Sequence, residues 1–240
     1  MATAADRYLV TCEHGGNDVP PRYRYLFDGI EHLLETHEGY DAGALAMAEA
    51  LANALAAPLV ASTTTRLLVE LNRSLGHPRL YSEGSRRAAP EVRRAILQEF
   101  YLPYRERIER YIEQALAEES RIVHISSHSF TPVLDGEVRH ADVGLLYDPK
   151  RGGEVALCKR WESAIVRRDA RLRVRRNYPY AGAADGLTTA LRRKFPEASY
   201  VGIELEVNQR FILHDMARWE EVRDITIDAL QDALGTRGSA

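Results

Sequence analysis

The stretch RIVHISSHSF, residues 121–130, predicts a β-strand with polar side chains along one face. Successive side chains of a strand point to opposite faces, so Val123 and Ile125 share one face. His124 and His128 share the other, which is unusual for a strand in a protein core. A buried histidine satisfied by hydrogen bonds accounts best for His124. At the exit of the strand, His128 is a candidate site residue.

Other apolar runs along the chain also predict strands, and helical patterns lie between them. The expected strands are Tyr8–Cys12, Leu59–Ser62, Leu67–Leu71, Ile122–Ser126, Val143–Tyr147, Leu172–Arg175 and Tyr200–Val207. Alternation of this kind predicts an α/β fold with a mostly parallel sheet covered by helices on both faces.

Three helical segments have recognisable starts or breaks. Asp41 stands where it could cap the alanine-rich helix of residues 42–57. Apolar residues recur at roughly helical spacing over residues 90–119, where Pro103 is expected to kink or divide the helix. A last helix is expected over Asp215–Leu234.

The composition suits one globular domain. The chain has 240 residues, of which 45% are hydrophobic, so it can bury a sizeable core. No Pro/Gly/Ser-rich linker divides it, which predicts a single domain over residues 1–240 with its core at about 7–235.

Charge and cysteine usage exclude several classes of partner and site. A formal net charge of -3 argues against bulk attraction to nucleic acid or to an anionic membrane. The two cysteines, Cys12 and Cys158, have no metal-ligand spacing and suggest no disulfide framework, so a reducing cytoplasm is the expected compartment. No signal peptide and no membrane-spanning run is apparent.

Two further stretches place ligand-type side chains at the ends of elements. In VTCEHGGNDVP, residues 10–20, a strand runs into a glycine turn and leaves His14 at the rim of the sheet; a histidine that caps the turn is the alternative. Asp41 stands at a helix start, where it can be a cap or a hard metal ligand. Two histidines and a carboxylate, with one position open to water, form a recurring catalytic zinc set.

Two carboxylates share one face of the strand in VGIELEVNQRF, residues 201–211. Burying Glu204 and Glu206 together costs free energy unless a metal, an arginine or a water-filled cleft compensates. An edge strand with a solvated face is the alternative.

A third group of polar residues suits recognition of a carboxylate. In TRLLVELNRS, residues 65–74, Arg66 and Arg73 flank the amide of Asn72, and an arginine fork beside an amide matches a carboxylate. Asn177 lies in the turn-rich stretch RRNYPYAGAADG. Surface salt bridges are the alternative reading of these arginines.

Six stretches follow one another along the chain in this order: CEHGGNDVP, HEGYDAGA, TRLLVELNRS, HISSHSF, NYPYAG and ELEVNQRF. Through these stretches the chain resembles the N-formylglutamate amidohydrolase family from near residue 10 to about residue 213. That family is similar in fold to the zinc carboxypeptidases and the aminoacylase-type deacylases. The resemblance therefore implies a single α/β domain with a central mixed sheet and one catalytic metal.

The resemblance also implies roles for individual residues. One zinc ion, or a similar divalent metal, would be bound by His14, His128 and Asp41, with Glu13 and Glu38 as other possible sources of the carboxylate. Of the two strand carboxylates, Glu206 ranks slightly above Glu204 as the general base. The pair Asn72 and Arg73 would bind the substrate carboxylate, with Arg66 and Asn177 as helpers.

The activity implied is zinc-dependent hydrolysis of the N-acyl amide of a small acidic amino acid such as N-formylglutamate. Two alternatives stay open: a related metallo-deacylase with another N-acyl amino acid as substrate, and a catalytically vacant binding protein on the same fold. A serine hydrolase is disfavoured because the chain has no G-x-S-x-G elbow, and a nucleotide enzyme because it has no glycine-rich phosphate loop.

Overall fold

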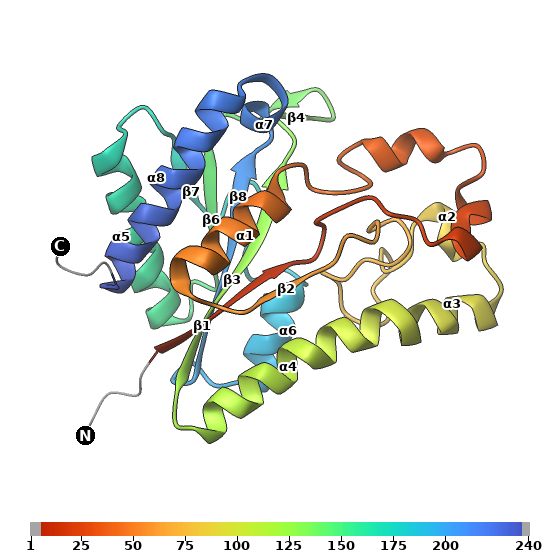
Figure 1. Ribbon diagram of the computed structural model, residues 1–240, viewed down its shortest axis with the longest axis horizontal. Helices are drawn as coiled ribbons and strands as arrows, with labels where there is room; N and C mark the ends of the chain where they lie inside the picture. The colour runs from red at the N-terminus through yellow and green to blue at the C-terminus, as the bar shows by residue number, and fades with distance from the viewer. Residues whose placement is uncertain (1–5, 237–240) are drawn as a thin grey trace.

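A six-stranded sheet forms the centre of the fold (Figure 1). The structure is a computed structural model that describes residues 6–236. The strands of the sheet are β1 (Asp6–Cys12), β2 (Leu59–Ala61), β3 (Arg121–Phe130), β6 (Val143–Leu146), β7 (Val174–Arg176) and β8 (Tyr200–Asn208). In the order β2-β1-β3-β8-β6-β7, every neighbouring pair is parallel except β8 with β6. The predicted α/β fold with a mixed, mostly parallel sheet is confirmed.

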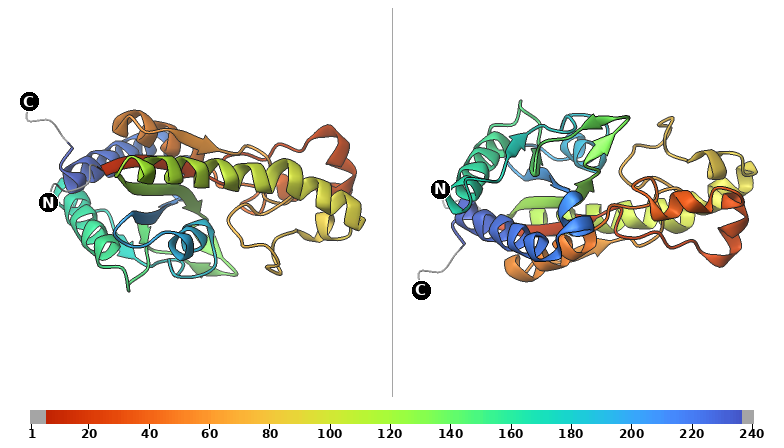
Figure 2. Two further views of the ribbon diagram at one scale, coloured as in Figure 1. Left: turned by 90° about the horizontal axis from the view of Figure 1, so that it is seen from below. Right: turned by 90° about the horizontal axis from the view of Figure 1, so that it is seen from above.

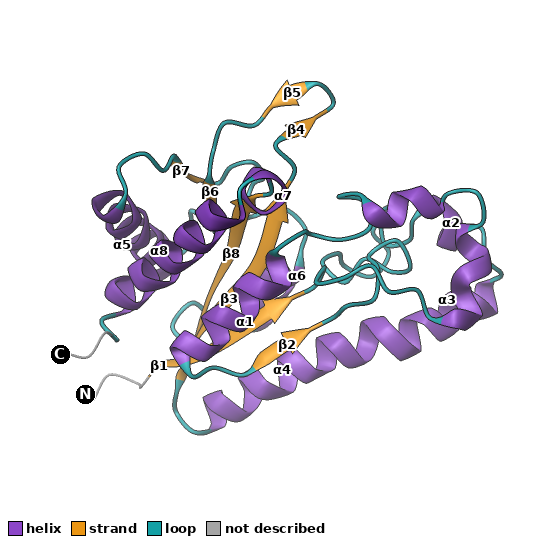
Figure 3. Cartoon of the chain, turned by 45° about the horizontal axis from the view of Figure 1, so that its top comes forward, coloured by secondary structure: helices purple, strands orange, loops and turns teal. Residues whose placement is uncertain are grey.

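Helices occupy most connections between the strands (Figure 3). The longer ones are α1 (Ala44–Leu55), α4 (Leu102–Ala117), α5 (Gly152–Arg168) and α8 (Met216–Leu234). The shorter ones are α2 (Glu83–Arg86), α3 (Pro90–Ile96), α6 (Leu187–Lys194) and α7 (Arg210–His214), with η1 (Pro21–Phe27) and η2 (Glu31–Glu35) as 3-10 helices and η3 (Leu97–Tyr101) as a π-helical turn. A two-stranded hairpin, β4 (Val133–Leu134) with β5 (Glu137–Val138), follows β3.

The two faces of the sheet bury separate apolar clusters. Val123 and Ile125 of β3 pack in the cluster that includes α1, α5 and α8. The alternate residue Ile122 and the facing Tyr200 of β8 pack with α4 and α6 on the opposite side. The views of Figure 2 show α4 and α3 continuing well past the sheet. His124 and His128 therefore lie on the α4 and α6 side, as the alternation of β3 predicts.

The strand register brings the polar stretches to one rim of the sheet. His128 pairs with Glu206 between β3 and β8, near the carboxyl ends of both strands. His14 lies two residues beyond the end of β1, which pairs with β3 in parallel. Three candidate side chains, distant in sequence, thus lie at the same end of neighbouring parallel strands.

The strand predicted over Leu67–Leu71 is wrong, because this segment folds into turns. Its backbone bonds locally and to a neighbouring loop: Leu68 N donates to Thr65 O, and Glu70 N donates to Leu80 O. The apolar residues of the run are nevertheless buried in the cluster beneath α4. An apolar run indicates that a segment is buried. Without alternation of apolar and polar side chains, it does not establish that the segment is a strand.

The helix cap predicted at Asp41 is also wrong. Helix α1 begins at Ala44, and its N-cap is Gly43, which has a φ of +80° and contributes no side chain. A side chain at Gly43 would meet the ring of Trp219, so glycine suits both the backbone and the space. The carboxylate of Asp41 points elsewhere, to the site described below.

The other helix predictions hold in the main. The π-helical turn η3 interrupts the long helix just before Pro103, where a break was expected. Helix α8 begins directly after Asp215, whose side chain accepts a hydrogen bond from Arg218 N as an N-cap. None of the helices within residues 6–236 combines the length and apolar character that a membrane span requires.

Candidate metal centre

A cleft of about 790 Å³ opens at the carboxyl ends of β1, β3 and β8. A volume of this size is typical of small-molecule sites. Its lining includes most of the residues that the sequence singled out: His14, Glu38, Asp41, Arg66, Asn72, Arg73, His128, Glu204 and Glu206.

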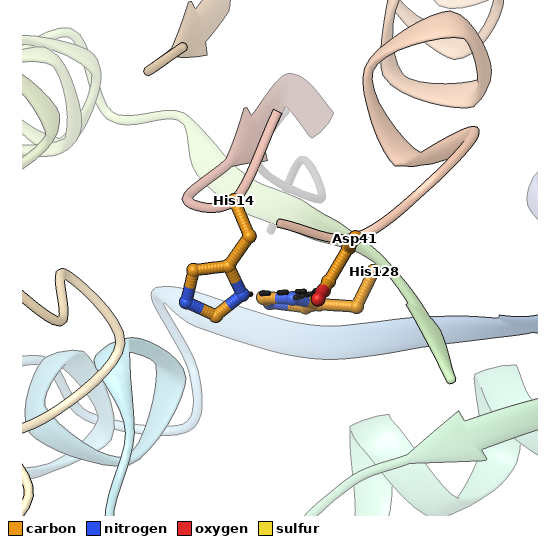
Figure 4. A group of neighbouring side chains, drawn as sticks. All are labelled: His14, Asp41 and His128. Atoms are coloured by element: carbon orange, nitrogen blue, oxygen red, sulfur yellow. Dashed lines mark hydrogen bonds and ion pairs between the residues drawn. The ribbon is translucent and has the colours of Figure 1, made fainter. Parts of the chain in front are cut away.

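His14, Asp41 and His128 converge inside this cleft (Figure 4). Asp41 Oδ2 lies 3.2 Å from His14 Nδ1 and 2.9 Å from His128 Nδ1. All three residues are buried, and one potential metal-ligand atom from each lies within 4.8 Å of the others. Asp41 reaches this position because its backbone N–H donates to His14 O, which ties the segment before α1 to the end of β1.

Buried carboxylates contact the outer nitrogen of each imidazole. Glu70 Oε1 hydrogen-bonds His14 Nε2, and Glu13 Oε2 lies 2.9 Å from His128 Nε2. The inner nitrogens, both Nδ1, are left facing Asp41. This is the arrangement found around metal-binding histidines, in which a second group holds the far side of the ring.

Glu70 is a site residue that the sequence analysis missed. Besides His14, it accepts hydrogen bonds from Arg66 Nε at 2.8 Å and from Arg66 Nη2 at 2.6 Å, and it accepts one from the backbone N–H of Asn72. The sequence signal that could have identified Glu70 is its place inside an otherwise apolar run. The structure shows that this carboxylate is buried, and a buried carboxylate needs compensating partners.

The charged groups of the cluster shift the pKa values of their neighbours. Burial alone would raise the pKa of Asp41, but His14, Arg66 and the hydrogen bond with His128 outweigh burial and hold that pKa well below its usual range. Burial alone would lower the pKa of His128, but Asp41 and Glu13 raise it well above its usual value. Because ligand nitrogens must be free of protons, a metal that binds here displaces protons.

Glu206 differs from Glu204 in its surroundings. Among residues 6–236, Glu206 Oε2 is one of two buried side-chain atoms without a hydrogen-bond partner. Burial, reinforced by the charges of Asp41 and Glu204 and opposed by that of His128, raises the pKa of Glu206 to about 8. Glu204 instead accepts a hydrogen bond from Thr188 Oγ1.

The predicted substrate-binding residues have different positions. Arg73 Nη1 donates to the backbone carbonyls of Asn72 and Asp185, and the side chain is half-buried in the cleft wall. Asn72 Oδ1 accepts the N–H of Leu187 at 2.6 Å, and its Nδ2 lies 3.5 Å from His128 Nε2.

Two of the residues predicted for the site have no position beside the three convergent side chains. Asn177 lies outside the cleft lining, where its Oδ1 accepts the N–H groups of Tyr147 and Gly182 and so shapes the loop. Glu38 is exposed at the cleft and contributes no atom to the group.

The donor set fits a divalent metal. Two imidazole nitrogens and one carboxylate oxygen, buried and within reach of one another, match the three-ligand sets that leave a coordination position open for water or substrate. The same set would suit several divalent ions that accept nitrogen and oxygen ligands.

A family model described as N-formylglutamate amidohydrolase matches residues 6–213. The chain belongs to the N-formylglutamate amidohydrolase family. Membership of this family implies an amidohydrolase, and the His14, Asp41 and His128 group gives this amidohydrolase a possible metal site.

Solved structures resemble this family member over nearly its whole length. A gene product of Agrobacterium tumefaciens is 27% identical, with a TM-score of 0.81, and the match covers 95% of this chain and 90% of that one. An N-formylglutamate amidohydrolase from Ralstonia eutropha JMP134 is 17% identical, with a TM-score of 0.67, over 98% of this chain and 97% of that one; it shows the shared fold. No curated protein matches the chain by sequence.

Proposed function

We propose that this amidohydrolase is zinc-dependent and cleaves the N-acyl amide of a small acidic amino acid such as N-formylglutamate. His14, Asp41 and His128 would hold the metal, and Glu206 would act as general base. The observation that carries the proposal is the unpartnered, buried oxygen of Glu206 in the cleft that holds the three convergent side chains. A buried carboxylate with no partner costs free energy, which is typical of a group that acts on a substrate or a water.

Bound by the three side chains, a divalent cation supplies Lewis acidity toward an amide carbonyl and toward water. Glu206 accepts a proton from the water that attacks the carbonyl carbon. It then donates that proton to the amine nitrogen as the C–N bond breaks, so the products are a carboxylic acid and a free amino acid. With its pKa raised to about 8, Glu206 holds a proton readily near neutral pH, and nearby positive charge would favour its ionised, proton-accepting form.

Arg73 and Arg66 would orient the substrate. Arg73 has no carboxylate partner among residues 6–236 and uses Nη1 on backbone carbonyls, so donors remain for the carboxylate of an amino acid. Arg66 uses three of its N–H groups on Asp41 and Glu70. Since a guanidinium has five such donors, Arg66 still has two for the cleft, where they could stabilise a developing oxyanion.

The size of the cleft favours a second candidate within the same chemistry. N-formylglutamate has twelve non-hydrogen atoms and fills only a fraction of about 790 Å³. A larger acyl group could therefore be accommodated, which makes another N-acyl amino acid the alternative substrate.

A substrate panel tests the proposal. N-formyl, N-acetyl and N-succinyl derivatives of glutamate, and their amides without free carboxylates, are assayed with zinc and with a chelator. We expect hydrolysis of the acids only, dependent on zinc. Turnover that persists in chelator would contradict the metal, equal turnover of acids and amides would contradict carboxylate recognition, and a preference for a larger acyl group would select the alternative substrate.

A further inference from the structure

We infer that Glu13 is a positioning residue, whose carboxylate holds the imidazole of His128 with Nδ1 directed toward Asp41 and His14. The inference rests on the proposed function, because it concerns how the chain orients one of the proposed metal ligands. It assigns a role to a carboxylate that the sequence left as a possible metal ligand.

The geometry places Glu13 on the outer side of the ring. Glu13 Oε2 lies 2.9 Å from His128 Nε2, and Asp41 Oδ2 lies 2.9 Å from His128 Nδ1. The two nitrogens point away from each other across the ring, so Glu13 does not reach the space between Asp41 and His14. A carboxylate that accepts the Nε2–H leaves the lone pair of Nδ1 available to a metal.

Glu13 is itself held in place from two other elements. Tyr104 of α4 donates its hydroxyl to Glu13 Oε1 at 2.7 Å, and Ser126 of β3 donates to Glu13 Oε2 at 2.6 Å. The Oγ of Ser126 also lies 2.9 Å from His128 Nε2, so the hydroxyl links the carboxylate to the ring. Both bonds to Glu13 are buried, and Glu13 has no exposed surface. The side chain is therefore fixed, and a fixed carboxylate restricts the ring that it contacts.

The electrostatics of Glu13 point to the same role. Among residues 6–236, no arginine or lysine pairs with it, and His128 is the one basic side chain that it contacts directly. Without an arginine or lysine partner, a buried carboxylate is a costly way to fill space, and an apolar side chain would fill it more cheaply. Contact with His128 accounts for a buried charge at this position, whereas packing alone does not.

A titration of zinc separates positioning from packing. Glu13→Gln removes the charge at nearly constant shape, and Tyr104→Phe removes one of the hydroxyls that hold Glu13. Tyr111→Phe is the matched control, because Tyr111 lies on the same helix and donates to the backbone of Tyr8, away from the cluster. Zinc affinity is measured by competition with a chromophoric chelator, and circular dichroism verifies that each variant is folded.

We expect zinc to bind about 10- to 100-fold more weakly to Glu13→Gln, since loss of such an outer hydrogen bond has effects of that size. Tyr104→Phe should weaken binding in the same direction by less, and Tyr111→Phe should match the wild type. Nitrogen NMR of the metal-free wild type should show the proton of neutral His128 on Nε2, and metal-free Glu13→Gln should show a mixture of tautomers.

Two different failures are distinguishable. If the wild type binds zinc, and Glu13→Gln binds it with the same affinity and keeps the same His128 tautomer, the positioning role is overturned and the proposed function stays intact. If Glu13→Gln does not fold, wild-type affinity in Tyr104→Phe overturns the role instead. No zinc binding by the wild type overturns the proposed function itself, and the inference falls with it.

Discussion

Replacing Glu206 with glutamine should flatten the pH dependence of stability in protein stripped of metal. In the fold, burial raises the pKa of Glu206 to about 8, whereas an exposed glutamate has a pKa of 4.5. Between these values the folded chain keeps a proton that the unfolded chain has released. The contribution of Glu206 to stability is therefore fully present below pH 4.5 and is lost as the pH rises toward 8.

The size of the effect follows from the one proton that differs between the two states. The free energy of unfolding falls by at most about 1.4 kcal/mol per pH unit for one such proton. From pH 5.5 to pH 8.0 the wild type should therefore lose up to about 3 kcal/mol that Glu206→Gln does not lose. Glutamine keeps the shape of the side chain and carries no titrating group.

Urea unfolding with circular dichroism, in the presence of a chelator, measures this difference at the two pH values. Glu38→Gln is the matched control, because Glu38 is exposed at the same cleft and contributes no atom to the three convergent side chains. Parallel stability curves for the wild type and Glu206→Gln would refute the reasoning, since they would mean that Glu206 titrates in the fold as it does in the unfolded chain.

Three other substitutions have distinct expected outcomes. Arg73→Lys keeps the charge but loses the planar fork, so kcat/KM on an acidic substrate should fall by an amount worth about 1.5 to 3 kcal/mol, and unchanged steady-state kinetics would assign Arg73 a structural role. His124 is buried and its pKa is lowered by burial to about 4, so the wild type should lose stability as the pH falls from 6.5 toward 4. Urea midpoints across that range should vary less in His124→Gln, and an equal dependence would contradict the assignment. Arg192→Met leaves Glu154 buried without its cation and should cost about 3 to 5 kcal/mol in urea unfolding, whereas a cost below about 1 kcal/mol would show that the pair is dispensable.

Local sequence pattern was enough for the strands at the centre of the sheet. The alternation of Val123 and Ile125 with His124 and His128 follows from strand geometry alone, and the structure buries the two sets on opposite faces. His124 is hydrogen-bonded to Thr11 and to Tyr200, as expected of a satisfied core histidine.

Features that depend on contacts between distant segments could not be predicted from the sequence. The run Leu67–Leu71 is apolar because α4 covers it, and its turns depend on backbone bonds that no local pattern specifies. Asp41 stands near a helix start, yet its direction is decided by Arg66 and the two histidines.

The ranking of the two strand carboxylates shows the same limit. Glu204 and Glu206 share a face of β8, so the strand period does not separate them. The difference arises from Thr188 on α6, which supplies a hydrogen bond to Glu204 and none to Glu206. Glu70 was missed for a related reason, since its partner His14 is 56 residues away in the chain.

Metal content of the purified protein tests the central claim most directly. The wild type, His14→Ala and His128→Ala are dialysed against zinc, freed of excess ion and analysed by atomic emission. We expect about one zinc ion per chain in the wild type and none in either variant, because a site of two histidines and a carboxylate loses its affinity for zinc when one imidazole is removed. A wild type without zinc, or variants that retain it at the wild-type level, would contradict the account.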